Sequence, residues 1–241
     1  MNSVAQSNGT QIDEIADGLF RVHTPVSLIP GGFSFNQYLL RDEQSLLFHT
    51  GPRSLFPQIR DTIATVLPLE RLHYIGFSHV ESDECGSLNQ FLAVAPCARP
   101  LCSEIAAMVS ITDLADSAPV SLADNEVMSL GRQSVRWIDA PHVPHGWENG
   151  FLMVDGLQAL LCGDLFTQPG AVHPPIIEGD ILGPSEAMRA QMDYYAHGPN
   201  TVAILEKLAA FQPQILACMH GSAWHGDGSA LLIRLARALA S

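Results

Sequence analysis

The first half of the chain alternates between short runs of branched and aromatic residues and turns rich in polar residues or glycine. Such runs are typical of β-strands, because branched and aromatic side chains pack well on a pleated sheet. The pattern predicts strands at 18–24, 35–41, 45–51 and 71–77. Between the last two, residues 53–67 carry apolar side chains at helical spacing from Leu55 to Leu67, which predicts a helix with Pro57 in its first turn.

The same alternation of strands and helices continues to the end of the chain. Further strands are expected at 99–104, 125–130, 133–140, 150–156, 157–164 and 213–220. Further helices are expected at 87–95 after an N-cap at Ser87, at 104–115, at 185–197, at 202–211 after an N-cap at Thr201, and at 228–240. A sheet-rich core between helices predicts an α+β fold, a four-layer αββα sandwich. No linker or repeat interrupts the pattern, so residues 1–241 are expected to form a single domain.

Composition and charge narrow the class of protein. A chain of 241 residues with 47% hydrophobic content can bury a sizeable core, which excludes disordered and fibrous classes. Lys and Arg number 12 against 25 Asp and Glu, a net charge of −13, and no basic run occurs. A field of this sign repels phosphate backbones and anionic lipids, so neither nucleic acid nor a membrane is an expected partner.

The termini and the cysteines indicate a cytoplasmic location. The N-terminus is polar and does not read as a signal peptide, and no apolar run reaches the length of a membrane span. The five cysteines, at 85, 97, 102, 162 and 218, form an odd set without a CxxC pair, which fits reduced thiols. We interpret Cys85 and Cys218 as small buried fillers, because nearby carboxylates disfavour a reactive thiolate.

Acids and imidazoles follow four of the predicted strands at their carboxyl ends. They are His79, Glu81, Asp83 and Glu84 in the run "HVESDE", then His142 and His145, then Asp164, and finally His220. Each alone has an ordinary explanation as a hydrogen-bonded or solvated side chain. Together they point to cations, because closely spaced carboxylates cannot all stay ionised without positive charge. The set therefore predicts a metal site.

The run "HVESDE" resembles the HxExDH motif in the diiron domain of flavodiiron proteins, also called oxygen-binding diiron proteins, a branch of the metallo-β-lactamase fold. Four more segments resemble family segments in the same order and span most of residues 15–225: "NQYLLRDEQSLLFHTG", "PHVPHG", "LLCGDLF" and "CMHGSAW". Glu81 indicates this branch, because hydrolases of the fold usually have a second histidine there. The resemblance implies a metallo-β-lactamase fold with two iron ions.

Position by position, the resemblance also implies a set of ligands. One iron ion would be bound by His79, Glu81 and His142, the other by Asp83, Glu84 and His220, and Asp164 would bridge them. His142 is preferred to His145 because "HVP" matches the family's His-x-Pro spacing. His145 would then lie beside the ligands, where it could orient a ligand or handle a proton as a catalytic group, or simply pack beside Trp147.

Two positions depart from the family pattern. Glu84 stands where the family has histidine, so four carboxylates carry −4, which two divalent ions would neutralise. An additional carboxylate should favour iron or manganese over zinc, since carboxylate is a harder ligand than imidazole. Alternatively, Glu84 turns away and the second site is weak or empty. The other departure is His49, where many relatives carry an aspartate that supports the site.

The resemblance implies a non-haem diiron protein that binds and reduces dioxygen or nitric oxide. In this family FMN in a C-terminal flavodoxin domain supplies the electrons, and the 21 residues after His220 (241 − 220) are too few for one. We therefore expect a separate donor of the flavodoxin or rubredoxin type, no FMN site in this chain, and a homodimer. Two alternatives stay open: a non-enzymatic oxygen sensor, and a metal-dependent hydrolase of a lactone, thioester or phosphoester that uses metal-bound hydroxide.

Overall fold

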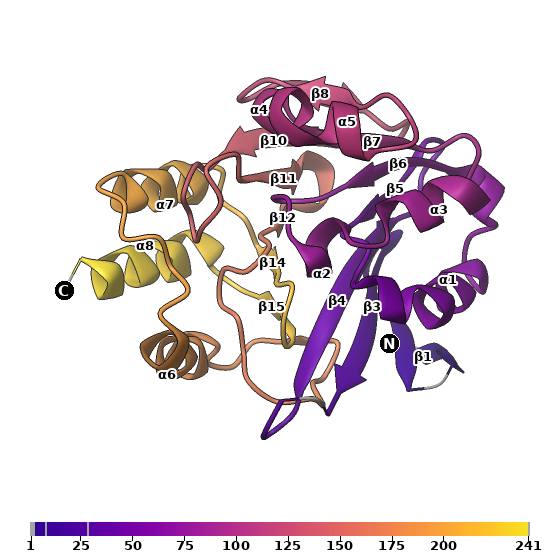
Figure 1. Ribbon diagram of the computed structural model, residues 1–241. Coiled ribbons are helices and arrows are strands. Elements are labelled where there is room, and N and C mark those ends of the chain that lie inside the picture. Colours follow the sequence, from indigo (N-terminus) through magenta and orange to yellow (C-terminus); the bar gives the residue numbers. More distant parts are fainter. Residues whose placement is uncertain (1–2, 8, 28, 241) are drawn as a thin grey trace.

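The computed structural model describes residues 3–7, 9–27 and 29–240, and two β-sheets face each other at its centre (Figure 1). The first sheet contains eight strands in chain order: β1 (Ser3–Ser7), β2 (Thr10–Ala16), β3 (Leu19–Val26), β4 (Phe33–Leu40), β5 (Ser45–Phe48), β6 (Leu72–Gly76), β7 (Arg99–Ser103) and β8 (Val120–Leu122). Strands β1 to β5 pair antiparallel, and β5 to β8 pair parallel.

The second sheet contains seven strands in the order β13 (Ile176–Ile177), β15 (Ala223–His225), β14 (Ile215–Ala217), β12 (Ala159–Leu161), β11 (Gly150–Val154), β10 (Ser134–Asp139) and β9 (Val127–Ser129). Strands β12 and β14 are parallel, with Leu161 opposite Ala217. The residues that follow these two strands therefore emerge side by side at one edge of the sheet.

Helices cover the outer face of each sheet (Figure 1). The first sheet is covered by α1 (Phe56–Ala64) and α3 (Leu88–Val94), and the second by α7 (Thr201–Ala209) and α8 (Gly228–Leu239). The remaining helical segments are α2 (Ser82–Cys85), α4 (Glu104–Ala106), a π-helical turn at Ala107–Ile111, α5 (Thr112–Leu114), α6 (Leu182–Met192), and 3₁₀ turns at Arg53–Leu55, Leu69–Arg71 and Asp155–Leu157. None of the helices in the described ranges is long and apolar enough to cross a membrane.

Three apolar cores hold the layers together. Between the sheets lie Tyr38, Phe48 and Trp137, all of them buried. Ile59 of α1 and Phe91 of α3 belong to the core on the outer face of the first sheet. A third core, which includes Leu205 of α7 and Leu232 of α8, covers the second sheet. The order helix, sheet, sheet, helix confirms the predicted αββα sandwich.

A few local predictions were wrong. The helix expected at 185–197 begins earlier, at Leu182, and ends at Met192, because Asp193 adopts a left-handed conformation with φ of 47°. Thr201 is the first helical residue of α7 rather than its N-cap. Strand β2 was not predicted because its sequence is polar; it nevertheless buries Thr10, Ile12 and Asp13.

Candidate metal centre

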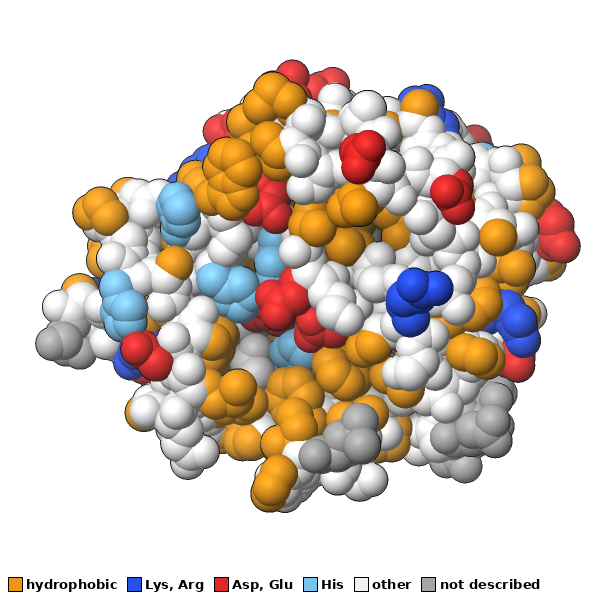
Figure 2. Space-filling view, in the orientation of Figure 1, with side chains coloured by type: hydrophobic (Ala, Val, Ile, Leu, Met, Phe, Trp, Pro, Cys, Tyr) orange, Lys and Arg blue, Asp and Glu red, His pale blue; other side chains and the backbone are white. Residues whose placement is uncertain are grey.

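Acidic and imidazole side chains gather in a hollow on one face of the molecule, where the loops after several strands meet (Figure 2). Strand β6 leads into His79, Glu81 and Asp83, while β12 leads into Asp164 and β14 into His220. His145 comes from the loop between β10 and β11. The fold thus brings together groups that lie far apart in the sequence, as expected for chemistry placed at strand ends.

Four side chains form the first group. The Nε2 atom of His79 lies 3.1 Å from Oε2 of Glu81 and 3.7 Å from Oδ2 of Asp164. The Nε2 atom of His145 lies 3.1 Å and 3.3 Å from the same two oxygens. Potential ligand atoms of His79, His145 and Asp164 all lie within 4.8 Å of one another, so one ion could contact all three.

A second group shares Asp164 with the first. The Nε2 atom of His220 lies 3.1 Å from Oδ1 of Asp164 and 3.5 Å from Oδ2 of Asp83. The two oxygens of Asp164 therefore face different groups, Oδ2 the first and Oδ1 the second. This is the arrangement that a carboxylate needs to bridge two ions.

Backbone carbonyls hold two of the cluster's three imidazoles from their far side. In His145 Nδ1 donates to the backbone oxygen of Tyr194 at 2.9 Å, and in His220 Nδ1 donates to that of Ser34 at 2.8 Å. A carbonyl only accepts, so Nδ1 carries the proton and Nε2 faces the carboxylates. Such contacts fix the ring orientation of metal-binding histidines.

His79 is supported differently, and here the departure at position 49 matters. Its Nδ1 lies 3.0 Å from the hydroxyl oxygen of Ser78, which also lies 3.1 Å from Nε2 of His49. His49 is fully enclosed, and burial lowers its pKa to about 3, so it remains neutral. A neutral histidine and a serine hydroxyl thus support His79 through hydrogen bonds.

Burial and close charges perturb the ionisation of the cluster. Hydrogen bonds from His145 and His79 lower the pKa of Glu81 to about 2. Burial raises the pKa of Asp164, but the hydrogen bond and charge of His220 and the charges of the other imidazoles outweigh it, and the net pKa is lowered. Burial lowers the pKa of His145, yet Glu81 and Asp164 raise it above its usual value. Perturbation of this kind is common at functional sites.

Glu84 is the most anomalous group of the cluster. Its side chain is completely buried, and neither carboxylate oxygen has a hydrogen-bond partner among the described residues. Its Oε2 lies 4.0 Å from Nε2 of His79. Burial, and then the charges of Asp164 and Asp83, raise its pKa well above the usual value. A buried carboxylate without partners is unfavourable unless it is protonated or bound by a cation.

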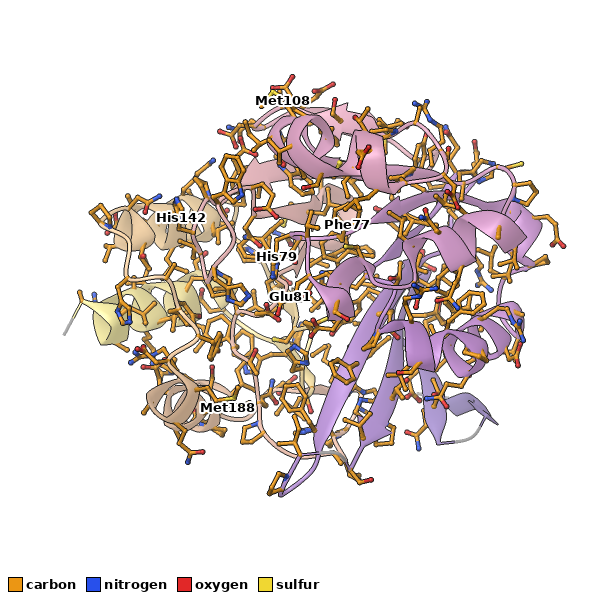
Figure 3. The ribbon with its side chains drawn as sticks, viewed as in Figure 1. Phe77, His79, Glu81, Met108, His142 and Met188 are labelled. Carbon is orange, nitrogen blue, oxygen red and sulfur yellow. The ribbon has the colours of Figure 1, made fainter. Side chains whose placement is uncertain are left out.

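The two histidines of "HVPH" occupy different places. We expected His142 among the ligands and His145 beside them; in the structure, His145 lies in the cluster and His142 is exposed, apart from His79 and Glu81 (Figure 3). The cause is the turn between β10 and β11. His142 has a positive φ of 67°, and its backbone nitrogen donates to the oxygen of Gly146, a turn that brings His145 to the centre.

An apolar-walled cavity of about 150 Å³ opens over the cluster. Its walls include Phe33, Met188, Met192 and Tyr194, none of which the sequence analysis singled out. Met188 and Met192 lie one turn apart on α6 at helical spacing, but nothing in the sequence shows that α6 passes over the cluster. Walls of this kind suit a small uncharged ligand.

The sequence of this chain matches one protein-family model and several characterised relatives. Residues 33–221 match the model of the family described as "ODP family beta lactamase". The rubredoxin-oxygen oxidoreductase of Megalodesulfovibrio gigas is 25% identical over 211 residues, which cover 83% of this chain and 51% of that protein. The nitric oxide reductase of Moorella thermoacetica is 24% identical over 242 residues, covering 92% of this chain and 60% of that protein. The chain thus spans about half the length of the curated relatives it matches.

Solved structures share the fold. The metal-soaked Flv1 flavodiiron core from Synechocystis sp. PCC6803 superposes with a TM-score of 0.83 at 22% identity, covering 95% of this chain and 60% of that one. A fragment of the putative diflavin flavoprotein A 5 from Nostoc sp. PCC 7120 gives a TM-score of 0.81 at 17% identity, covering 98% and 95% of the two chains. At these identities the likeness establishes the metallo-β-lactamase fold.

Proposed function

The chain belongs to the ODP family of β-lactamase-fold domains, and from this membership we propose that it is a non-haem diiron protein that reduces dioxygen or nitric oxide. Relatives named for the reduction of oxygen and of nitric oxide support the proposal. The observation that carries it for this chain is Glu84, a fully buried carboxylate with two unpartnered oxygens in a cluster of acids and imidazoles. Cations would relieve that arrangement, so the residues present fit a metal centre.

We assign six of the ligands from the distances in the cluster. His79, Glu81 and His145 would hold one ion and Asp83 and His220 the other, and Asp164, whose two oxygens face the two groups, would serve both. Glu84, which lies within ligand reach of His79 and Glu81, is placed with the second ion on the resemblance of "HVESDE" to the family motif. The four carboxylates carry −4, which two divalent ions balance. A ferrous pair in this place would supply electrons and an open coordination position for dioxygen or nitric oxide.

The protein side chains prepare the site for that ligand. The backbone oxygens of Tyr194 and Ser34 keep the Nε2 atoms of His145 and His220 turned inward. The neighbouring carboxylates raise the pKa of His145 and of His220, so a metal ion at either Nε2 would compete with protons. Phe33 and the two methionines of α6 give this cavity an apolar wall.

The electrons would come from a separate donor protein of the flavodoxin or rubredoxin type. The name of the relative from Megalodesulfovibrio gigas supports a rubredoxin-type donor. We also infer that residues 1–241 act as one domain, since the two sheets share a continuous core. The homodimer is proposed on the family resemblance alone.

Metal analysis and donor-dependent turnover test the proposal together. Protein produced with iron should contain near two ions per chain, and its visible spectrum should change on anaerobic reduction and again on exposure to oxygen. Steady oxygen or nitric oxide consumption should be slow with NADH alone and fast once a flavodoxin or rubredoxin reduction system is added. Oxygen binding without any donor-dependent turnover would contradict the enzyme and indicate a sensor.

A second candidate function, hydrolysis of a lactone, thioester or phosphoester, is favoured by one observation. A cavity of about 400 Å³ shares Glu81 with the site, and Arg53 and Leu88 are among its lining residues. It has room for an organic substrate with a negative charge beside Arg53. Rapid ester hydrolysis by the zinc-loaded protein, with reduced iron-loaded protein inert toward oxygen, would replace the first proposal with this one.

A further inference from the structure

Two buried cysteines lie in contact beneath the cluster. The Sγ atoms of Cys162 and Cys218 are 3.9 Å apart, and neither residue has any exposed surface. They directly follow the parallel strands β12 and β14, in which Leu161 lies opposite Ala217. The backbone nitrogen of Cys162 donates to the oxygen of Ala217, so the two cysteines continue the same register.

This placement meets the geometric requirements of a disulfide bond. Neighbouring strands lie about 4.8 Å apart, within the span of roughly 4.4–6.8 Å between the Cα atoms of bridged cysteines. The sulfur atoms need to approach by about 1.9 Å from their present separation to reach a bond of about 2.0 Å. A side-chain rotation at two adjacent strand ends can supply that movement without a change of fold.

We propose that Cys162 and Cys218 are a redox-active pair that hydrogen peroxide converts reversibly into a disulfide, a role for Cys218 beyond the small buried filler expected from the sequence. One thiol attacks a peroxide oxygen, which breaks the O–O bond and yields a sulfenic acid and one water. The second thiol then attacks the sulfur of the sulfenic acid. The hydroxyl group of the sulfenic acid leaves with the proton of this thiol as a second water. Two thiols and one peroxide thus give one disulfide and two waters, with no other oxidant. The inference does not depend on the proposed diiron function.

The position of the pair gives the oxidation a structural consequence. Cys162 lies two residues before Asp164, and Cys218 lies two residues before His220. The Oδ1 atom of Asp164 and the Nε2 atom of His220 are 3.1 Å apart. A disulfide would therefore tie together the strand ends that carry these two groups. Both Asp164 and His220 line the cavity over the cluster, so the pair lies two residues along each chain segment from groups that border this cavity.

Peptide mapping of the whole, unaltered chain tests the proposal. The chain is reduced, freed of reductant, treated with a small excess of hydrogen peroxide, denatured, and alkylated. The five thiols of the sequence should fall to three (5 − 2), and the map should contain one linked pair of peptides, those carrying Cys162 and Cys218, which dithiothreitol separates. A map in which both cysteines remain alkylated while the exposed Cys97 is oxidised would overturn the proposal, as would a link between Cys85 and Cys102.

Serine variants provide the matched controls. C162S and C218S should each give no linked pair of peptides after the same treatment, because the remaining cysteine lacks its partner thiol and its oxidation stops at the sulfenic acid. C97S has four thiols before treatment (5 − 1) and should still lose two of them, which leaves two. Loss of two thiols from C162S or C218S would assign the oxidation to other cysteines. Should either variant fail to fold, the peptide map of the unaltered chain decides alone.

Discussion

Asp164 and His220 meet across two neighbouring parallel strands, with Oδ1 of the aspartate 3.1 Å from Nε2 of the histidine. Each follows its strand by three residues, Asp164 after β12 and His220 after β14, so the register of the sheet sets their separation. The other oxygen of Asp164 faces His79 and His145. A single carboxylate thus connects the two halves of the cluster, and its removal should affect both.

The first prediction concerns that connection. In D164N the bridging charge is lost while size and most contacts remain, so both sites should lose affinity and the iron content should fall from near two to well below one per chain. The variant should also lose the rise in melting temperature that iron gives the unaltered protein, since metal bound only by the folded state stabilises it. Metal analysis and thermal unfolding with and without iron measure both effects. Full iron retention in D164N would contradict the assignment of Asp164 as a ligand.

The second prediction uses two histidines from one loop as a matched pair. H145A removes an imidazole whose Nε2 lies about 3 Å from two carboxylates, and it should reduce the iron content by about one ion per chain. H142A removes an exposed side chain three residues away and should leave iron content and spectrum unchanged. Metal analysis of the two variants prepared in parallel gives the comparison. The reverse result, loss with H142A and retention with H145A, would restore the ligand expected from the His-x-Pro spacing.

The sequence predicted the groups that directly follow strands and could not predict those placed by a loop. His79, Asp164 and His220 follow regular strands, whose ends can be read from runs of branched residues. The choice between His142 and His145 depends on a positive φ at His142, and spacing alone does not reveal it.

Contacts between segments that lie far apart in the chain could not be predicted from the sequence either. The carbonyl of Tyr194, which orients His145, comes from the segment where a longer helix was expected. Strand β2 was missed for a different reason: its polar residues carry no hydrophobic pattern, and only pairing with β3 makes them a strand. The four layers were predictable because they depend on long apolar patterns, whereas these features depend on tertiary contacts.

The third prediction concerns the pH dependence of stability at His23. The Nε2 atom of this buried histidine lies 3.1 Å from the oxygen of Ala171, and its Nδ1 lies 2.8 Å from Nη2 of Arg21 and 2.9 Å from Oδ1 of Asn36. Burial, and then the charge of Arg21, lower its pKa to about 4. In the unfolded chain the pKa of this histidine is about 6.5, so between pH 4 and pH 6.5 the unfolded chain binds more protons than the folded chain. The contribution of the neutral ring to the free energy of unfolding is therefore complete above pH 6.5 and is lost as the pH falls toward 4.

Urea unfolding between pH 4.5 and 7.5 measures this contribution. H23Q keeps a polar side chain that cannot be protonated, so the loss of unfolding free energy below pH 6.5 should be smaller by about 1 kcal/mol per pH unit. H197Q, at an exposed histidine of the surface, is the control and should follow the unaltered protein. Identical slopes for H23Q and the unaltered protein would show that His23 does not remain neutral in the folded state.

The last prediction concerns Glu84, the carboxylate where the family has histidine. If Glu84 binds the second ion, E84H removes one negative charge from a buried site and should destabilise the ferric state more than the ferrous state, because the ferric state carries more positive charge. An effective interaction of about 1 kcal/mol corresponds to roughly 40 mV for one electron, so the reduction potential should rise by at least that amount. If Glu84 is instead protonated and holds no ion, E84H should increase the iron content from near one to near two per chain.

E84Q, of the same size but without charge, separates charge from shape: it should lower iron content if Glu84 binds the second ion and leave it unchanged if Glu84 is protonated and holds no ion. Redox titration and metal analysis of E84H and E84Q beside the unaltered protein decide between the two, and a pair of variants that match it in both quantities would exclude position 84 from the metal centre.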